Sequence, residues 1–597
     1  MLTRATPPSP ESLQTAAGGA LRQKLPMLLY TLLLGVFVTA LIVAPLASIL
    51  YRSVVDLDGG GIRFTSRYFE AVLGGEVYWV ALWNTLLVSL GASLVATAIG
   101  VVLAWLFVRT DAAGGAMLEW VCQLPIFIPP FVGAVAWSLL AAPRSGIMNR
   151  LLVSAGLPGA LDVYSLTGIL LVIGMYLAPY VMMIVAASLR SMDPSLEEAA
   201  QVCGLTRLQT ARRITAPLLA PAILSGAALA FTIALGLFGT PVVLGWARQI
   251  LMLTSRIWIS SQEVPPAYGV MAVLAIYLLL LSSLATWLQH AALRGRSYVT
   301  VSGKGYRPAL LGLGAWRWPA SGLALLYVAG TILAPIAVLV AAACSRYTWS
   351  GQYDLANMLA ALSTDDVWFT LRNSVTISVL SATAATVAGI LISWAVVRTR
   401  LPGRDLLEYL VLLPISVPGI AFGVGFMLVW IGLPLPVYGT MLIIILAFVG
   451  RFTAYAVRSI SASLVQVHPE LEESARICGY GPIRTFTRIT LPLILPSIIA
   501  AWMLLFSFFM TELSMVVVLY TAQNRTFSVL AFEAWNVGDF SRLASYSLLQ
   551  MAVGMAFMAA LKLVLRRRAA PPDAGLRSVS RLLPPMRGGH HSMEKVR

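Results

Sequence analysis

The sequence predicts an all-α integral membrane protein with about twelve transmembrane helices, arranged as two parallel homologous halves of six helices each. Three observations predict this fold class. Apolar residues make up 59% of the 597 positions and charged residues only 11%, whereas roughly a quarter of the residues in a soluble globular protein are charged. The apolar residues gather in long runs, and one pattern of residues occurs twice along the chain. A water-soluble chain of this length could not cover so much apolar surface, so lipid is the expected solvent.

Twelve apolar runs are long enough to cross a bilayer, which takes about 20 predominantly apolar residues per helix. A closed barrel would need short alternating segments instead. The first run is too long for a signal peptide and no small-residue cleavage pattern follows it, so we expect it to remain as a span. The predicted spans are 27–50, 82–107, 118–142, 167–187, 218–244, 269–293, 320–343, 375–397, 406–432, 438–457, 493–520 and 544–565.

The distribution of basic residues predicts the orientation of these spans. With twelve spans both termini lie on one side, and that side carries 29 Lys and Arg residues against 11 on the other. Because basic loops stay in the cytoplasm, both termini are expected there. The net charge of +16 does not indicate nucleic-acid binding, since the basic residues form short clusters between apolar runs and no folded basic face.

An internal repeat divides the chain into two halves. Identical residues recur 289 positions later for Asn84, Trp105, Arg109, Glu119 and Pro129. Identical residues recur 275 positions later for Glu197, Gly204, Ile214, Pro217 and Pro221. Six spans per half make the two repeats parallel, related by an axis along the membrane normal. The expected organisation is a cytoplasmic tail at 1–26, a first half at 27–297, a linker at 298–318, a second half at 319–568 and a cytoplasmic tail at 569–597.

Two predicted cytoplasmic segments, 193–217 and 468–492, carry the most informative pattern. Pro194 and Pro469 suit the first turn of a helix, and the acidic residues that follow complement the helix N-terminus. In the first copy Asp193 is also a good cap.

Each segment then has a glycine, Gly204 or Gly479, that can end the short helix in a left-handed conformation. A second, basic helix follows, and Pro217 or Pro492 marks the return to the membrane. A pair of ordinary interfacial helices is the alternative, and the duplication of the pattern at matched positions disfavours it.

The pattern Glu-Ala-Ala, three residues, Gly, nine residues, Ile-x-x-Pro resembles the cytoplasmic EAA loop of the permeases of binding-protein-dependent ABC importers. The first copy matches in full, and the second has Ser474 in place of one alanine. The resemblance covers nearly all of residues 27–565 and implies the type I ABC importer permease fold in a bacterial cytoplasmic (inner) membrane. It identifies as ATPase-coupling residues Glu197, Glu198, Ala199, Ala200, Gly204, Ile214 and Pro217 in the first loop. In the second loop it identifies Glu472, Glu473, Ala475, Gly479, Ile489 and Pro492.

In that family the short helix docks in a cleft of a separate ATPase subunit, and closure of the two ATPases moves the two permease halves. The resemblance therefore implies two partners, an ATP-binding-cassette ATPase homodimer on the cytoplasmic side and a periplasmic solute-binding protein. The chain itself has no P-loop, because Gly303-Lys304 would need a glycine at position 298, where Tyr298 stands. We expect no enzymatic activity and no cofactor in this chain, with ATP bound by the partner.

The four cysteines are too few and too scattered for a disulfide framework, and the four histidines show no metal-ligand spacing, so no metal site is expected. An ion-coupled secondary transporter would also have twelve spans and a repeat. It would not need the two loops, and no chain of intramembrane carboxylates is present for a proton relay. No catalytic constellation for a membrane-embedded enzyme is present either.

The transported solute is indicated only by resemblance. The second half, through Gly450-Arg451-Phe452 and Thr511-Glu512-Leu513-Ser514, is most similar to the fused permeases of ferric-iron importers. Many of those have a basic residue where this chain has Thr511. Similar fused permeases serve thiamine and aminoethylphosphonate, so 2-aminoethylphosphonate, thiamine, polyamines and sulfate-like anions stay open.

Two ionisable residues, Arg451 and Glu512, lie within predicted spans, and they are expected to face the bundle or each other. They form either a polar contact lining the pathway or a structural ion pair that joins spans 10 and 11. Matched prolines also occur in the third span of each half, at Pro125, Pro129, Pro130, Pro414 and Pro418. They predict a helix broken near the pathway, or a merely structural bend.

Overall fold

The computed structural model describes residues 29–57, 62–159, 161–193, 195–293, 310–345, 352–399 and 403–569. The chain divides into two compact units, Met1–Met551 and Ala552–Arg597. The described part of the second unit is the C-terminal part of helix α26 (Phe540–Ala569). All contacts reported below lie within the first unit.

In the described part of the chain nine helices are long and apolar enough to cross a membrane, and two sharply bent helix pairs bring the number to eleven if each pair is one span. They fall one to one on the first eleven predicted runs, which confirms the all-α membrane fold. The twelfth run, 544–565, lies on α26, whose side chains are described only in part. The single helices are Leu29–Val54, Glu76–Arg109 (α4), Leu166–Ser191 (α8), Ala211–Gly236, Tyr268–Ala291, Gly314–Ala343, Asp365–Arg398 (α18), Met441–Gln466 (α21) and Pro482–Thr511.

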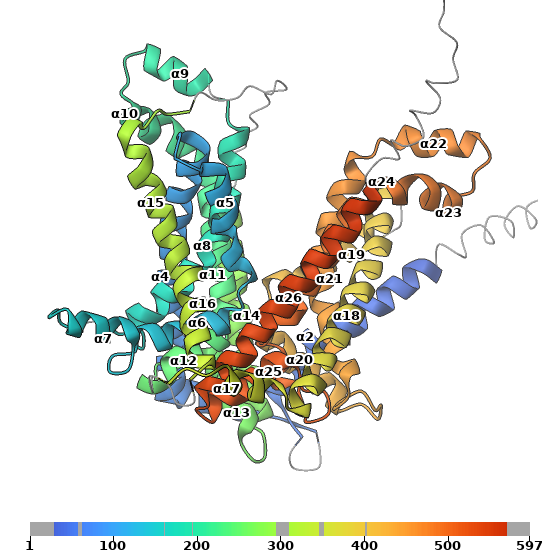
Figure 1. Cartoon of the computed structure of the whole chain (residues 1–597). Helices are drawn as coiled ribbons and strands as arrows, with labels where there is room; N and C mark the ends of the chain where they lie inside the picture. Colours follow the sequence, from blue (N-terminus) through green and yellow to red (C-terminus); the bar gives the residue numbers. More distant parts are fainter. Residues whose placement is uncertain are drawn as a thin grey trace, which may run out of the picture. The chain divides into compact units, whose positions relative to one another are not determined.

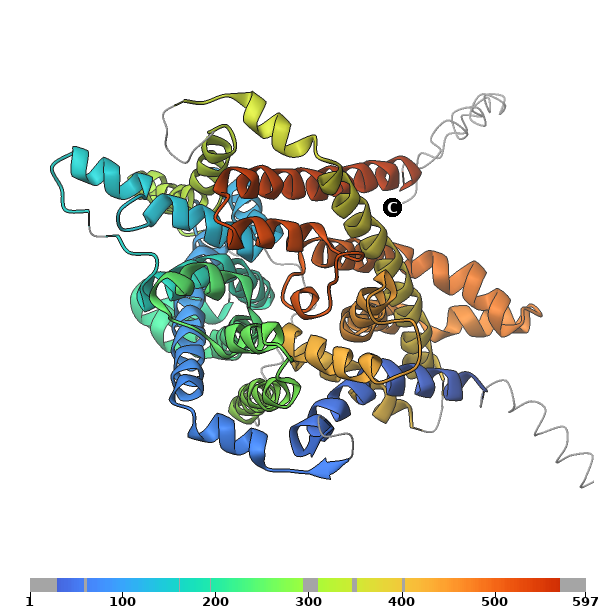
Figure 2. The same cartoon turned by 90° about the horizontal axis from the view of Figure 1, so that it is seen from below.

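The first span of the chain packs against the second half. It contains a π-helical turn, η1 (Thr39–Val43), followed by α2 (Ala44–Val54), and α2 packs on α20 (Gly419–Ile431). Figure 2 shows this dark blue helix beside the orange helices of the second half. A Cβ atom on Gly425 would lie 2.3 Å from the carbonyl oxygen of Pro45, and one on Gly450 would lie 2.4 Å from that of Leu41. Glycine is therefore required where these backbones cross.

The seventh span makes the reciprocal crossing onto the first half. Its parts are α15 (Arg317–Val328), the π-turn η6 (Ala329–Leu333) and α16 (Ala334–Ala343). Figure 1 shows α15 beside α5 and α16 beside α6, which they contact. The hydroxyl of Tyr327 donates to the carbonyl of Met175 at 3.0 Å, and that of Tyr176 donates to the carbonyl of Thr331 at 3.2 Å. The first span of each half thus packs against the other half.

The second and fourth spans form the main helix pair of each half, α4 with α8 and α18 with α21. Matched glycines, 289 positions apart, allow the close approach. A Cβ on Gly100 would lie 2.8 Å from the carbonyl oxygen of Ala178, and one on Gly389 would lie 2.6 Å from the Cβ of Ala456.

The third span of each half is broken, as the matched prolines predict. In the first half α5 (Gly115–Gln123) and η2 (Leu124–Phe127) meet α6 (Pro130–Ala141) at 99°. In the second half α19 (Arg404–Leu412) and η7 (Leu413–Ser416) meet α20 at 115°. The breaks fall at Ile128 and Val417, which have extended ψ angles of 121° and 124°, because a residue that precedes proline avoids the helical region.

The helix of each fifth span begins before the predicted first residue, 218 or 493. One continuous helix, Ala211–Gly236 or Pro482–Thr511, runs through Pro217 or Pro492. A π-turn precedes each proline, η3 (Ala211–Thr215) before α11 (Ala216–Gly236) and η8 (Phe486–Thr490) before α24 (Leu491–Thr511). The wider turn accommodates a residue that has no N–H and whose ring would meet the preceding turn.

The fifth spans also end earlier than predicted. The sequence predicts helices to 244 and 520, but α11 ends at Gly236 and α24 at Thr511. Leu237 and Glu512 are extended, and short helices follow, α12 (Gly239–Gly245) and η9 (Val516–Val518). The apolar run continues through these short elements, so hydropathy alone did not reveal the break.

The remaining elements connect the spans, apart from α14, which is the sixth span, and η5 and α23, which are the first turns of the seventh and eleventh spans. They are β1 (Val55–Asp56), β2 (Arg63–Phe64), α3 (Arg67–Gly74), α7 (Ile147–Ser154), α9 (Ser195–Val202), α10 (Arg207–Thr210), η4 (Trp246–Arg248), α13 (Leu253–Gln262), α14 (Tyr268–Leu293), η5 (Gly314–Trp316), α17 (Leu355–Leu362), α22 (Pro469–Ile477), α23 (Pro482–Thr485) and α25 (Phe527–Asn536). β1 and β2 pair antiparallel, with Val55 opposite Phe64.

Candidate functional site

The first loop has the predicted form of a short helix, a glycine turn and a second helix. α9 is followed by Gly204 at φ +85°, and α10 leads into the fifth span. The backbone N–H of Ser195 donates to Asp193 Oδ1 at 2.9 Å, so Asp193 caps this start. Hydrogen bonding to Ser195 holds the pKa of the Asp193 carboxyl below its usual value. Pro194 lies outside the described residues.

The second loop repeats this form. α22 is followed by Gly479 at φ +82°, and α23 leads into the fifth span of the second half. Figure 1 shows α9 and α22 at the same end of the molecule. A positive φ is energetically unfavourable for any residue that has a Cβ atom, so both turns require glycine.

Each loop helix has an outer and an inner face. On the outer face Glu198 and Glu473 are exposed, whereas Ala200 and Ala475 are buried on the inner face. The outer face ends in an apolar tip, where Val202 is 89% exposed and its repeat partner Ile477 is 87% exposed. Of the other predicted residues, Ala199, Pro217 and Pro492 are exposed and Ile214 and Ile489 are half-buried. An exposed apolar side chain at the same place in two loops is suited to contact with a partner protein.

The inner glutamate of the second loop, Glu472, is bound to the end of the second span. Arg398, the last residue of α18, donates from Nε to Glu472 Oε1 at 3.0 Å. Thr490 Oγ1 donates to the same oxygen at 2.8 Å. Arg398 Nη2 also donates to the carbonyls of Leu464 at 2.9 Å and Val467 at 2.7 Å. This largely buried guanidinium therefore joins the second span, the fourth span and α22.

The first loop has the matched residues in a looser arrangement. Arg109, the last residue of α4, lies with Nη2 at 3.5 Å from Glu197 Oε1. Thr215 Oγ1 donates to that oxygen at 2.7 Å. Among the described residues no hydrogen-bond partner is present for the guanidinium of Arg109.

The sequence alone did not predict a role for these arginines and threonines. Arg109 and Arg398 are equivalent in the repeat and lie 289 positions apart. Glu197 and Glu472 are equivalent at a spacing of 275 positions, as are Thr215 and Thr490. The repeat marks all six residues, and only the structure shows that they meet.

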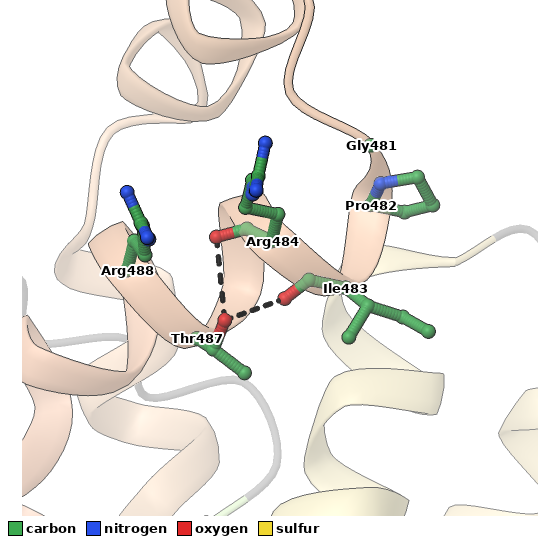
Figure 3. Close-up of a pocket in the computed structure, with 6 residues that line it drawn as sticks. All are labelled: Gly481, Pro482, Ile483, Arg484, Thr487 and Arg488. Atoms are coloured by element: carbon green, nitrogen blue, oxygen red, sulfur yellow. Dashed lines mark hydrogen bonds between the residues drawn. The ribbon is translucent and has the colours of Figure 1, made fainter.

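A surface hollow of about 540 Å³ lies beside the second loop. Figure 3 shows its lining: Gly481, Pro482, Ile483, Arg484, Thr487 and Arg488. The Thr487 hydroxyl bonds back to the carbonyls of Ile483 and Arg484, while the two arginine side chains extend away from it. This lining adds two arginines, Arg484 and Arg488, to the second loop.

The intramembrane residues Arg451 and Glu512 meet at Gly419. A Cβ atom on Gly419 would lie 3.3 Å from Arg451 Nη1 and 3.2 Å from Glu512 Oε1. Arg451 Nη2 donates to the carbonyl of Val417 at 3.2 Å, and Glu512 Oε1 accepts from the N–H of Met515 at 3.0 Å. The ion pairs found among the described residues do not include this pair. Each side chain therefore satisfies backbone at a broken span, and the two charges are neighbours.

The first half has no charge at the equivalent place. The residues that match Gly419, Arg451 and Glu512 in the repeat are Pro130, Tyr176 and Leu237. All three line a small apolar cavity of about 40 Å³. The described residues contain no group of three or more His, Cys, Asp or Glu side chains placed to hold a metal ion.

Two interlocked halves with broken third and fifth spans, each carrying an exposed glycine-turn loop, define a duplicated membrane permease. The chain belongs to the family of binding-protein-dependent transport system inner membrane components, whose model matches residues 96–297 and 385–569. The match occurs once in each predicted half, which confirms the fused duplication. The chain is thus a multi-pass inner-membrane permease of an ATP-binding-cassette importer.

Three relatives illustrate the range of this family. The ferric transport system permease protein FbpB of Actinobacillus pleuropneumoniae is 28% identical over 514 residues, 83% of this chain and 73% of the relative. The sulfate transport system permease protein CysT of Salmonella typhimurium (strain LT2) is 30% identical over 227 residues, 37% of this chain and 80% of the relative. The putative 2-aminoethylphosphonate transport system permease protein PhnV of Salmonella paratyphi A is 25% identical over 263 residues, 42% of this chain and 97% of the relative.

Proposed function

We propose that this chain forms the solute pathway of an importer for ferric iron and couples to separate ATPase subunits through α9 and α22. One observation supports the coupling role most strongly. Each loop helix turns one glutamate toward the bundle, buried Glu472 or half-buried Glu197, and exposes a second one beside an apolar tip, Val202 or Ile477. Two similar docking faces at the same end of the molecule are suited to binding two copies of one ATPase subunit.

Ferric iron is favoured as the solute by the extent of the similarity. The ferric transport permease aligns with 83% of this chain, and so with both halves. The sulfate and aminoethylphosphonate permeases align with 37% and 42%. 2-Aminoethylphosphonate is the first alternative, followed by thiamine and polyamines.

ATP hydrolysis is assigned to the partner. No P-loop spacing occurs in the sequence, and the family is one of permease components. We propose that the chain holds no cofactor, that a periplasmic binding protein delivers the solute, and that the purified chain alone hydrolyses no ATP. Robust hydrolysis by the isolated polypeptide would contradict this part of the proposal.

We also propose that both termini face the cytoplasm and that 27–297 and 319–568 act as the two permease halves, joined by the linker 298–318. The excess of basic residues on the side of the termini, 29 against 11, supports this orientation. The loops carrying α9 and α22 then lie in the cytoplasm, where the ATPase subunits are.

Docking is tested by placing a charge on the apolar tips. Ile477→Asp and Val202→Asp put a carboxylate into a contact expected to be dry, so the ATPase subunit should no longer co-purify with the chain. Val537→Asp is the matched control, because Val537 is 79% exposed at the opposite end, next to α25. Loss of the ATPase from the control as well, or its retention by both tip variants, would contradict docking on α9 and α22.

The solute is tested by uptake of radiolabelled ferric iron in iron-starved cells that lack this protein. Wild type should restore uptake, and Gly479→Pro should not, because proline cannot adopt the φ of +82° found there. Membrane levels of both proteins are compared. If wild type restores no iron uptake, iron is wrong, and labelled 2-aminoethylphosphonate is measured in the same cells.

A further inference from the structure

The second span of each half has a buried arginine at its cytoplasmic-loop end. The side chains of Arg109 and Arg398 are 4% and 11% exposed. Burying a guanidinium is unfavourable unless it is paired and hydrogen-bonded, so this placement calls for an explanation. In both halves the partner is the inner glutamate of the coupling loop.

Near its other end, at its ninth and tenth residues, each second span is also hydrogen-bonded to the segment that follows the broken fifth span. Asn373 Nδ2 donates to the carbonyls of Gln523 at 3.3 Å and Arg525 at 3.2 Å. Ser374 Oγ accepts from the N–H of Phe527, the first residue of α25, at 2.7 Å.

The first half repeats this second joint. Asn84 Nδ2 donates to the carbonyl of Leu251 at 3.1 Å. Thr85 Oγ1 accepts from the N–H of Leu253, the first residue of α13, at 2.9 Å. Asn84 and Thr85 precede Asn373 and Ser374 by 289 positions, so both ends of both second spans follow one design.

Between its joints each second span is one uninterrupted helix. α4 and α18 each have 34 residues, and the joints at Asn373 and Arg398, like those at Asn84 and Arg109, are 25 residues apart, about 38 Å at 1.5 Å per residue. A helix of this length that packs along its neighbour is stiff along its axis. It connects the loop at one end with the helix α13 or α25 at the other.

We propose that α4 and α18 are connecting rods that carry the movement of the coupling loops to α13 and α25 on the far side of the permease. Arg398 and Arg109 are positioning residues at the loop joints, and Asn373 with Ser374, like Asn84 with Thr85, forms the far joint. This proposal rests on the proposed coupling to an ATPase.

The two rods are unequally attached. Arg398 donates three hydrogen bonds, to Glu472, Leu464 and Val467, whereas among the described residues the Arg109 side chain has only the 3.5 Å contact with Glu197. In the first half the linker supplies backbone contacts instead. The N–H of Leu311 donates to the carbonyl of Arg109 at 2.9 Å, and the N–H of Asp111 donates to the carbonyl of Leu311 at 3.2 Å. The rod of the second half therefore has the stiffer side-chain joint.

The test uses the full chain with its ATPase subunit and binding protein in proteoliposomes, and it measures solute taken up per ATP hydrolysed. Arg398→Ala should keep the ATPase bound and hydrolysing but lower this ratio about tenfold, the change expected for losing one charge-assisted hydrogen-bonded joint. Asn373→Ala with Ser374→Ala should act in the same direction. A fall of hydrolysis and transport together, with loss of the complex, would show a merely structural role.

The decisive variant combines both joints. A rod that is disconnected at one end transmits nothing more when the other end is lost, so the combined variant should be no worse than the more severe of its parents. Losses that multiply, to about a hundredfold, would overturn the proposal because independent sites add in free energy. Arg109→Ala is the matched control that tests whether the two rods are unequally attached. If it lowers the ratio of transport to hydrolysis as much as Arg398→Ala does, the two rods are equally attached and the inference of unequal attachment is wrong.

Two further measurements cover poor folding and an absent partner. If Arg398→Ala does not fold, Arg398→Lys keeps the charge but loses the fork that reaches Glu472 and two carbonyls, and it should show the same change in the ratio. In the isolated chain, a spin label on the exposed Cys478 should become more mobile with Arg398→Ala, while one on Cys203 should not. Unchanged mobility of the label at Cys478 would show that Arg398 does not hold the second loop. A wild-type chain that retains no ATPase subunit would instead refute the proposed function.

Discussion

The guanidinium of Arg451 and the carboxylate of Glu512 approach the same glycine, Gly419, at the break of the third span of the second half. Both groups are also bound to backbone, Arg451 to the Val417 carbonyl and Glu512 to the Met515 N–H. The broken third and fifth spans leave such backbone groups without helical partners, and a membrane interior offers no water to satisfy them. The contacts favour a structural role for the two charges over a role in binding the solute.

Neutralising the pair tests this role. Arg451→Met alone leaves the Val417 carbonyl unsatisfied and the Glu512 carboxylate without its neighbouring cation, so we expect a loss of about 2–3 kcal/mol of stability. Glu512→Gln added to it should recover part of that loss, and the double variant should still transport. Thermal unfolding in detergent and uptake in cells are the measurements. A double variant that folds normally but does not transport would place the pair in the pathway.

The orientation of the loops is open to thiol labelling. Cys203 and Cys478 are exposed beside the two turns, whereas Cys122 and Cys344 are buried. A membrane-impermeant maleimide should label the wild-type chain in inside-out vesicles and not in right-side-out vesicles. The variant Cys203→Ser/Cys478→Ser should remain unlabelled in both. Labelling of the wild type from the outside would reverse the proposed topology.

The sequence predicted the elements of this permease better than their contacts. Eleven spans fall on predicted runs, and the prolines at 129 and 418 correctly placed both breaks, because hydropathy and proline geometry are local properties. The glycine turns at 204 and 479 were predictable for the same reason. The early ends of the fifth spans were not, since Val516–Val518 continues the apolar run in a different conformation.

Contacts between distant residues could not be read from spacing. Arg398 and Glu472 belong to parts of the repeat with different offsets, 289 and 275, so the repeat itself does not pair them. The crossing of the first span onto the second half depends on two glycines, Gly425 and Gly450, whose partners Pro45 and Leu41 lie 380 and 409 residues away in the sequence. Only packing in three dimensions brings them together.

The crossing predicts a strong effect of small substitutions. In Gly425→Ala the new methyl would lie 2.3 Å from the Pro45 carbonyl oxygen, a backbone atom that cannot move aside alone. We expect a loss of about 2–3 kcal/mol, as for overpacking at a close helix contact. Gly35→Ala is the control, because nothing lies within 4 Å of its position. Equal thermal unfolding temperatures for both variants would show that the first span does not pack here.

Acid should loosen the first loop before the second. Bonding to the N–H and hydroxyl of Ser195 lowers the pKa of Asp193. A carboxyl whose pKa is lower in the folded protein adds stability above its unfolded pKa, about 3.9, and loses it as the pH falls through the folded value. The cap on α9 is therefore complete from pH 5 to 8 and is lost only below about pH 4. His468, the residue before α22, makes no side-chain cap, so the start of α22 lacks this dependence.

Spin labels at Cys203 and Cys478 measure both loops in one chain. The label at Cys203 should gain mobility below about pH 4, and Asp193→Ala should show that mobility already at neutral pH while Asp193→Asn keeps the cap. Equal acid responses at the two labels would show that Asp193 does not hold the start of α9.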